Sequence, residues 1–300
     1  QIHALIRGIG LSTDGKGKSL WAPRKEGQIE AIQRAYGNDL DPSQLQYIEA
    51  HATSTQVGDQ TELQSLADTL EGKLPPGTKI PIGSVKGNVG HTIETAGMAG
   101  LLKTILSMKN GMIPPQPNVK RLNPKIDWKN SPFVVPLEPT PWPTPADGQP
   151  RRAAVNSFGI GGLNVHIVLD DGSALSSLSS NLPATKSTPC EPIAILGVGA
   201  VLPGARTVEA FWEMLRSGTD GKSQLPVERW DHEVARRHSE HLRNTLSIQG
   251  GFVTDFEYDW KTHRVPPKQI ATADPLQFMM LDAVEQAMRM AGFHDREFNR

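Results

Sequence analysis

Cysteine is nearly absent from this sequence, whose 300 residues include only one, Cys190. A single cysteine excludes an intramolecular disulfide framework and a zinc site made of several cysteines. The shortage favours a protein of a reducing compartment, with a merely Cys-poor secreted protein as the alternative.

An excess of one charge and a long apolar run are lacking as well. The sequence has 31 Lys and Arg against 32 Asp and Glu, for a formal net charge of −1, which argues against a nucleic-acid partner. No apolar run approaches the roughly 20 residues that span a bilayer, and the N-terminus lacks the charged and apolar regions of a signal peptide. We therefore expect a cytoplasmic protein with no membrane span.

What is present is the pattern of a layered α/β protein. From residue 2 to about residue 170, short β-rich runs alternate with amphipathic helical runs. The expected strands are residues 3–9, 45–49, 80–85, 153–157 and 164–169.

Two helices are predicted between these strands. The first covers about residues 59–70, where Asp59 and Glu62 are spaced like a capping box. The second is capped by Thr92 and ends at Gly111, and the glycines inside it predict close packing against another backbone.

The composition changes further along the chain. Residues 114–150 are rich in proline, which predicts an extended surface segment, and residues 171–190 are rich in Ser, Thr, Ala and Pro, which predicts a flexible linker. A second α/β unit is expected over residues 191–300. Its expected elements are a strand at 192–197, a helix at 208–217 capped by Thr207, and a long helix at 276–291 whose Met and Leu stripe is interpreted as core.

The most informative stretch is EAHATSTQVGDQTE, residues 49–62. A strand ends on His51, and a small turn containing Thr53 and Thr55 leads into a helix. Ligands of α/β folds gather at the carboxyl ends of strands, so His51 lies where chemistry is usually done, although a lone histidine there is more often structural.

The second stretch is KGNVGHTIETAGMAG, residues 86–100. It places Lys86 and Asn88 on a glycine turn and His91 at an expected helix N-terminus, where the helix dipole favours a neutral ring. A turn that simply binds an anion is the alternative.

The third stretch, NSFGIGGLNVH at residues 156–166, places Phe158, Gly159 and Gly161 between two strands. Backbone amides in such a turn approach a ligand closely, which suits an oxyanion hole or a substrate gate. A glycine-rich hairpin with Phe158 in the core is the alternative. A dinucleotide fingerprint is excluded because a strand, not a helix, follows the glycines.

Taken in order, EAHATST, KGNVGH and NSFGIGGLNVH resemble the late motifs of β-ketoacyl synthases, the ketosynthases of type I polyketide and polyunsaturated fatty acid synthases. IRGIGLSTDGKG, IPPQPNV and RRAAVNSFG extend the similarity over residues 1–170. The resemblance implies a thiolase-like fold, layered α-β-α-β-α, of which residues 1–170 are the C-terminal half. It also implies a Cys-His-His site in which a cysteine is acylated and two histidines assist the decarboxylation of a malonyl thioester.

The resemblance assigns roles to individual residues. His51 and His91 match the two family histidines, Lys86 matches the lysine before the second, and Phe158 matches a phenylalanine that gates the acyl pocket. Two neutral imidazole donors aimed at an enolate oxygen would stabilise charge that exists only in the transition state. The neighbouring candidates for substrate binding or gating are Thr53, Thr55, Asn88, Gly159 and Gly161.

The family's acylated cysteine lies well upstream of the first histidine, which places it before Gln1. The chain begins with Gln1 and stops soon after its last helix, so we expect it to be cut at both ends. Cys190, within STPCEP, lacks the family's small-residue turn and is predicted to be an inert linker residue. These 300 residues alone are therefore expected not to condense anything.

The resemblance also implies the partners. Malonyl and acyl thioesters are carried on the phosphopantetheine of an acyl carrier protein domain, no cofactor is bound directly, and the ketosynthase forms a homodimer.

Two departures from the family pattern stand out. The usual HGTGT reads HATST, so we expect that Ala52 and Ser54 do not need a positive φ. Gly100 stands where some bacterial condensing enzymes carry a glutamate, which leaves the electrostatic partner of Lys86 unidentified. Glu94 is a candidate, although a carboxylate there also suits a helix dipole.

Residues 191–230 resemble the opening of another ketosynthase. GVGAVLPG is not interpreted as a dinucleotide site, because its third glycine is misplaced and the helix starts only after Thr207. DPLQFMMLDAVEQAMRMAG, from Asp274, resembles the family's DPQQR helix with Phe278 in place of the arginine. A second ketosynthase directly after the first resembles the tandem ketosynthase and chain-length-factor layout of polyunsaturated fatty acid synthases.

The sequence leaves three alternative functions to compare. The first is an acyltransferase of the 3-oxoacyl-[acyl-carrier-protein] synthase type. The second is a non-catalytic, chain-length-factor-like scaffold, which stays open for the second unit. The third, a metal site of His51, Asp59, Glu62 and His91, is disfavoured because Asp59 and Glu62 are assigned to helix capping, so no metal is expected.

Overall fold

The computed structural model describes residues 2–15, 22–145, 148–159, 161–173, 193–228, 233–234, 237, 249–261, 266–270 and 273–293. The chain divides into two compact units, residues 1–87 with 93–195 and residues 88–92 with 196–300. From residue 174 onward the predicted linker lies outside the described residues, and so does Cys190. The domain boundaries expected at 170 and 191 therefore stay predictions.

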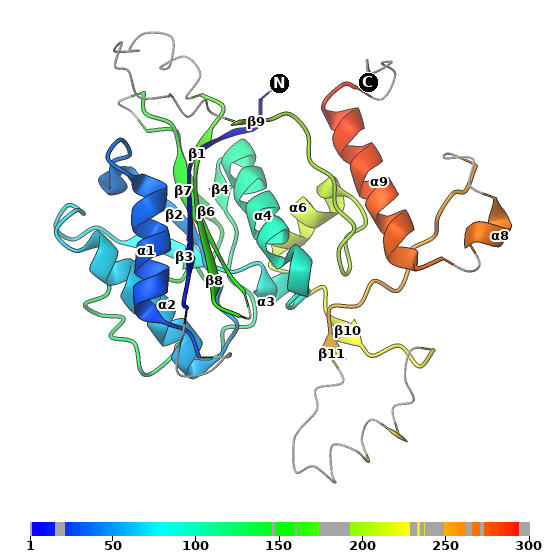
Figure 1. The fold of residues 1–300 in the computed structure, drawn as a ribbon, viewed down its shortest axis with the longest axis horizontal. Coiled ribbons are helices and arrows are strands. Elements are labelled where there is room, and N and C mark those ends of the chain that lie inside the picture. Colours follow the sequence, from blue (N-terminus) through cyan, green and yellow to red (C-terminus); the bar gives the residue numbers. More distant parts are fainter. Residues whose placement is uncertain are drawn as a thin grey trace. The chain divides into compact units, whose positions relative to one another are not determined.

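The first unit is built on a seven-stranded mixed sheet (Figure 1). All five strands predicted for residues 1–170 are present in it. In spatial order the strands are β5 (Phe133–Val134), β3 (Ile80–Gly83), β2 (Tyr47–Glu49), β7 (Arg152–Phe158), β8 (Leu163–Asp171), β1 (Ala4–Thr13) and β9 (Ile193–Ile195). One edge strand, β5, was not predicted, and the other, β9, is the strand expected at 192–197, which pairs with β1 of the first unit rather than belonging to the second.

The pairing of the strands explains where the site lies. The strands β5, β3, β2 and β7 run parallel, so β2 and β7 end at the same edge of the sheet. The strands β7 and β8 form an antiparallel hairpin in which Asn156 stands opposite His166. His51 follows β2 and Phe158 ends β7, which brings two of the sequence motifs to one edge.

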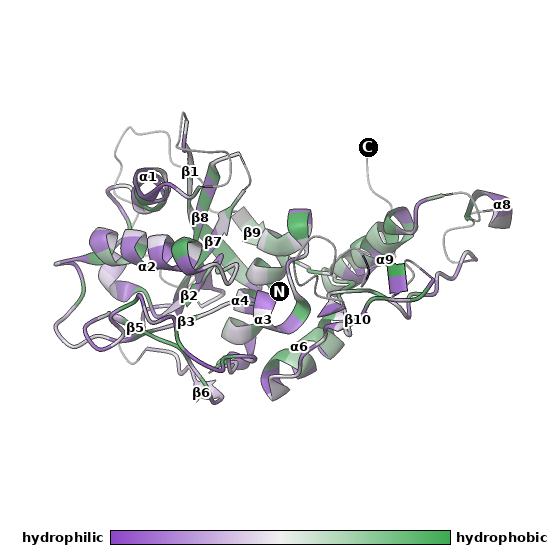
Figure 2. Cartoon of the chain, turned by 90° about the horizontal axis from the view of Figure 1, so that it is seen from below, coloured by the Kyte–Doolittle hydropathy of each residue, from purple (hydrophilic) through white to green (hydrophobic). Residues whose placement is uncertain are grey.

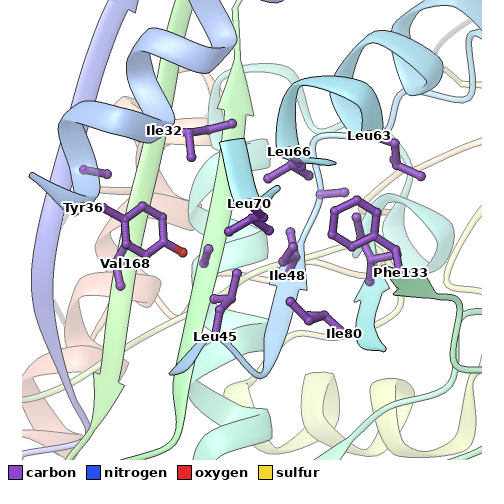
Figure 3. Close-up of a cluster of buried hydrophobic side chains, with 14 residues drawn as sticks. Ile32, Tyr36, Leu45, Ile48, Leu63, Leu66, Leu70, Ile80, Phe133 and Val168 are labelled. Atoms are coloured by element: carbon purple, nitrogen blue, oxygen red, sulfur yellow. The ribbon is translucent and has the colours of Figure 1, made fainter. Parts of the chain in front are cut away.

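Helices cover both faces of this sheet (Figure 1). On one face lie α1 (Lys25–Tyr36) and α2 (Gln56–Leu70), and on the other lies α4 (Ala96–Asn110). Figure 3 shows the main apolar cluster, to which α2 contributes Leu66 and Leu70, α1 contributes Ile32 and β2 contributes Ile48. This layered arrangement confirms the predicted α/β class.

The predicted helix starts are wrong in two places. The helix α2 begins at Gln56 and is capped by Thr55, whose Oγ1 accepts a hydrogen bond from the Gly58 N–H at 3.2 Å. The helix α4 begins at Ala96, after a 3₁₀ turn, so Thr92 is not its cap. Its end at Gly111, with a φ of 60°, is as predicted.

The glycines of α4 allow close packing, but against side chains rather than backbone. A Cβ at Gly97 would lie 2.9 Å from the Ser157 Oγ, and one at Gly100 would lie 3.0 Å from the Glu49 Cγ. Both neighbours belong to the motif strands, so the glycines bring α4 onto the site.

The proline-rich segment is more than the surface extension that we expected. It forms β5 and β6 (Thr140–Pro141), the latter paired with β4 (Met112–Ile113) just before the segment, and it buries Phe133 and Trp142. The Trp142 Nε1–H donates to the Gln46 Oε1 at 2.8 Å, which ties the segment to the chain just before β2.

In the second unit the two predicted helices are confirmed. They are α6 (Val208–Ser217), capped by Thr207, and α9 (Pro275–Met290), capped by Asp274. The remaining short elements are β10 (Ser223–Gln224), β11 (Gln249–Gly250) and α8 (Pro267–Ile270). None of the helices in the described parts of the chain is long and apolar enough to cross a membrane.

The glycine pair of GVGAVLPG has a packing role within the second unit. A Cβ at Gly197 would lie 2.0 Å from the Ala287 carbonyl oxygen, and one at Gly199 would lie 1.8 Å from the Ala283 carbonyl oxygen. Only glycine therefore lets this segment run against the backbone of α9.

The Met and Leu stripe of α9 is not the core that we expected. Figure 2 shows hydrophobic residues on this helix, and Leu276, Met280 and Val284 are 62%, 64% and 52% exposed. Only Phe278 of this helix is buried among the described residues, against the ring of Tyr258 at 4.6 Å between centroids. The remaining apolar face has no cover from the described part of the second unit.

Candidate active site

The His51 ring is fixed by a backbone amide of the neighbouring strand. The Phe158 N–H donates to the His51 Nδ1 at 3.3 Å, and the two rings lie 5.5 Å apart between centroids. Because Nδ1 accepts this bond, it carries a lone pair, and the proton of the neutral ring is on Nε2. His51 is therefore a hydrogen-bond donor through Nε2.

The turn that follows His51 is strained. Ala52 has a φ of 29° and Ser54 a φ of 61°, so the expectation that these positions avoid a positive φ is wrong. A non-glycine residue in this region costs about 1–2 kcal/mol. Other contacts must therefore hold the turn in place.

Replacing Ser54 with glycine is expected to stabilise the chain by about 0.5–1 kcal/mol, because relief of the strained φ exceeds the added entropy of the unfolded state. Urea unfolding at neutral pH measures the difference. Gln64→Gly, on the exposed face of α2, is the control and is expected to destabilise by about 1 kcal/mol. If Ser54→Gly and Gln64→Gly destabilised the chain equally, the interpretation that Ser54 is strained would be wrong.

Glu62 is one residue that holds the turn. Its carboxylate accepts the N–H groups of His51 and Ala52, each at 2.8 Å, and the Asn156 Nδ2–H, also at 2.8 Å. The side chain is buried, and burial raises the pKa of the carboxyl, while these three donors and Lys86 act in the opposite direction. The assignment of Glu62 to a capping box is therefore wrong.

A sequence signal for this role exists. Glu62 lies on the apolar face of α2, four residues before Leu66, whereas a capping residue belongs to the start of a helix. A carboxylate at a core position requires a buried partner, and the nearest polar stretch is the turn at His51.

Lys86 begins α3 (Lys86–Val89) and is half-buried. Burial lowers the pKa of its ammonium group, whereas Glu49, then Glu62 and Asp59, favour the charged form. These three carboxylates are the partners that the sequence left unidentified, and Glu94 is not among them.

A second buried network underlies the turn on the α4 face. The Glu49 Oε2 accepts the Tyr47 hydroxyl at 2.7 Å and the Lys103 ammonium at 2.9 Å, and the Glu49 Oε1 accepts the Val85 N–H at 2.5 Å. The side chains of Glu49 and Lys103 are each 2% exposed. Sequence reasoning missed this pair, although Gly100 leaves the space that the Glu49 side chain occupies.

The glycine hairpin after Phe158 uses much of its own hydrogen-bonding capacity. The Gly159 N–H donates to the Leu163 carbonyl at 2.7 Å, and the Gly162 N–H donates to the Gly159 carbonyl at 3.1 Å. Gly161 has a φ of 97°, which an L side chain rarely adopts. The amides of Phe158, Gly159 and Gly162 thus already have partners, so these three do not form an oxyanion hole in this conformation.

The other predicted residues fall into both units. In the first, Thr53 is half-buried and Thr55 caps α2. In the second, Asn88 is buried and its Nδ2–H donates to the Thr219 carbonyl at 3.1 Å, while His91 is exposed after Gly90, which has a φ of 78°. Within the described ranges no three His, Cys, Asp or Glu side chains are placed to hold a metal ion.

Comparisons with known proteins show the family to which the chain belongs. The family described as "Beta-ketoacyl synthase, C-terminal domain" matches residues 3–120, and "Beta-ketoacyl synthase, N-terminal domain" matches residues 190–300. The chain belongs to the β-ketoacyl synthase family. The C-terminal part of one ketosynthase precedes the N-terminal part of a second, as predicted, and a "Ketoacyl-synthetase C-terminal extension" matches residues 123–239.

Curated relatives of this ketosynthase chain are large synthases. Over 57% of the chain it is 40% identical to prosolanapyrone synthase of Alternaria solani, and over 97% it is 32% identical to a polyunsaturated fatty acid synthase subunit of a Thraustochytrium species. The chain spans 6% and 14% of the lengths of these two relatives.

Solved structures give the same result. The ketosynthase from module 6 of the bacillaene synthase of Bacillus subtilis matches with a TM-score of 0.54 and 38% identity, over 57% of this chain and 31% of that one. A PfaC keto synthase-chain length factor matches with a TM-score of 0.52 and 32% identity, over 97% of this chain and 30% of that one. These neighbours confirm the thiolase-like fold class.

Proposed function

We propose that the chain is part of an acyltransferase that performs a decarboxylative Claisen condensation. A malonyl group on the phosphopantetheine of an acyl carrier protein loses CO2, and the resulting enolate carbon attacks the thioester of an acyl-cysteine. A carbon-carbon bond forms, the carbon-sulfur bond to the enzyme breaks, and the cysteine leaves as a thiolate. No cofactor other than the carrier's own arm takes part.

One observation carries this proposal, namely the hydrogen bond from the Phe158 N–H to the His51 Nδ1. It leaves Nε2–H as a preorganised donor, which is what an enolate oxygen requires at the moment its charge develops. A neutral donor also avoids protonating the enolate carbon before it attacks. His91 is proposed as the second donor, by its match to the family motif.

The remaining roles follow from the surroundings of His51. Lys86 is proposed to add positive charge near the malonyl carboxylate, since three carboxylates favour its protonated form despite burial. Phe158 is proposed to gate the acyl pocket, because its ring lies against His51. Roles in substrate binding for Thr53, Thr55, Asn88, Gly159 and Gly161 stay predictions.

The nucleophile is proposed to lie elsewhere in the synthase. The sequence has one cysteine, Cys190, which follows all three motifs. We therefore expect no condensation by these 300 residues alone. A cytoplasmic location and a homodimer through the ketosynthase also stay predictions.

For the second unit a scaffold function is a separate candidate. The polyunsaturated fatty acid synthase relative and the keto synthase-chain length factor each match 97% of the chain, so the similarity extends over both units. A chain-length-factor-like partner would shape a tunnel without its own nucleophile. Exchange of the cysteine of the second ketosynthase, wherever the synthase carries it, would leave product formation unchanged under this candidate.

The test of the main proposal uses the synthase that contains this chain. His51→Ala is expected to lower the release of labelled CO2 from malonyl carrier protein by about 100- to 1,000-fold, the range for loss of one preorganised donor. His3→Asn, at a half-buried histidine just before β1, is the matched control and is expected to retain the activity. Retention of activity by His51→Ala would overturn the proposal.

A further inference from the structure

The His51 turn is connected to a buried polar chain that no step of the condensation uses. These hydrogen-bonded side chains are Glu62, Asn156 and His166, and they come from three different elements, α2, β7 and β8. All three side chains are buried, with exposures of 2%, 3% and 0%. Buried polar side chains generally have hydrogen-bond partners, so the orientation of these three side chains is set by the bonds between them.

The direction of each bond in this chain is fixed. The Glu62 Oε1 accepts the His51 N–H and, at 2.8 Å, the Asn156 Nδ2–H, so the Asn156 amide turns its Oδ1 toward His166. That oxygen only accepts, so the His166 Nδ1, at 2.6 Å, carries a proton. The amide of Asn156 therefore cannot rotate without losing both bonds.

The strand β7 reaches His51 by two routes. The Asn156 side chain holds Glu62, which binds the His51 and Ala52 backbone amides. Two residues further on, the Phe158 N–H binds the His51 ring directly. The strand β7 thus fixes both the backbone position and the tautomer of His51. The second effect depends on Glu62, which holds the strained turn close enough for the Phe158 N–H to bind the ring.

We propose that Asn156, oriented by His166, is a positioning residue that keeps His51 in its Nε2–H form by holding Glu62 on the turn. The proposal rests on the function proposed above for His51, and it adds a specific residue that the family motifs do not assign to catalysis. Asn156 touches no reacting atom. It acts through Glu62 and the backbone of the turn.

The experiment follows the tautomer of His51 rather than activity. In the 300-residue chain labelled with ¹⁵N-histidine, the imidazole nitrogen shifts distinguish Nδ1–H from Nε2–H, and His51→Ala assigns the signals. Wild type is expected to show a single Nε2–H form at pH 8. Asn156→Ala is expected to show both tautomers at populations above about one in ten each, as in a ring without a fixed partner.

The matched control is Gln28→Ala. Gln28 is a buried side-chain amide on the same face of the sheet, where its Oε1 accepts the Ser65 hydroxyl at 3.0 Å, and it is not a member of the hydrogen bonds that join Glu62, Asn156 and His166. It is expected to lower the melting temperature without changing the His51 signals. A merely structural role of Asn156 would give this same result.

A second variant covers the case in which Asn156→Ala does not fold. Asn156→Val with His166→Leu removes both polar partners together, so no buried donor is left unsatisfied, and valine suits a strand. Two tautomers at His51 in this folded variant support the proposal, whereas a single Nε2–H form in either folded variant overturns it. Failure of the function itself would show separately, as undiminished CO2 release by His51→Ala.

Discussion

Lys103→Met is expected to destabilise the chain by about 3–5 kcal/mol, the range for removing one partner of a buried ion pair. The Lys103 ammonium lies 2.9 Å from the Glu49 carboxylate, and both side chains are 2% exposed. Methionine fills much of the same space but leaves the Glu49 carboxylate without its ion-pair partner, with the Tyr47 hydroxyl and the Val85 N–H as hydrogen-bond donors and Lys86 as a nearby positive charge. Urea unfolding followed by tryptophan fluorescence measures the loss.

Two controls separate the charge effect from a general effect of the substitution. Lys109→Met lies on the same helix at an exposed position and is expected to change stability by about 0.5 kcal/mol or less. Adding Glu49→Gln to Lys103→Met is expected to recover part of the loss, because the buried group is then neutral. Similar stabilities of the Lys103 and Lys109 variants would refute a role for the pair.

Acid is expected to destabilise the fold through His166. Burial lowers the pKa of this histidine to about 3, from 6.5. Between these values the unfolded chain binds more protons than the folded one, so the contribution of His166 is complete above pH 6.5 and is lost as the pH falls toward 3. At pH 4.5 the loss amounts to about 3 kcal/mol.

His166→Asn isolates this effect. The asparagine Nδ2–H takes the place of the His166 Nδ1–H toward Asn156, and it does not titrate. Tyr36 of α1 lies against His166, with the rings tilted by 39° and 5.7 Å apart between centroids, and burial raises the pKa of the Tyr36 hydroxyl, so it stays neutral over this range. The two proteins contain the same carboxylates. Wild type should lose about 3 kcal/mol more than the variant between pH 7 and pH 4.5, and parallel losses would exclude His166 as the source.

Local signals were sufficient for much of the fold. The helix α6 was predicted with its bounds and with Thr207 as its cap, and Gly218, with a φ of 67°, ends it in the structure. The helix α1 was not predicted. It follows Arg24, which makes no side-chain cap, and it buries Gly27 and Gln28, so its apolar stripe is weak. Its position is set by packing against β1 and β8, which the sequence of α1 alone does not contain.

In the site, too, some residues could be predicted from the sequence and others depend on contacts between distant parts of the chain. The resemblance to the family motifs assigned His51, Lys86 and Phe158. In the first unit Phe158 binds the His51 ring, and Lys86 lies near enough to Glu49 and Glu62 to feel their charge. Glu62 was misread because a carboxylate that caps a helix and one that reaches back to a turn have the same spacing. The Glu49–Lys103 pair joins a strand to a distant helix, and such long-range partners leave no local pattern. The catalytic roles themselves stay predictions.

One edge strand of the first unit's sheet, β9, comes from residues after the predicted linker. Ile193–Ile195 pair with Ala4–Ile6 of β1 and cover part of an edge that would otherwise present unpaired amides and carbonyls. A gene fragment that stops at residue 170 would keep every proposed active-site residue of this unit and still expose that edge to pairing with another molecule. The practical boundary for expressing this unit is therefore after residue 195, beyond the point where the sequence composition changes.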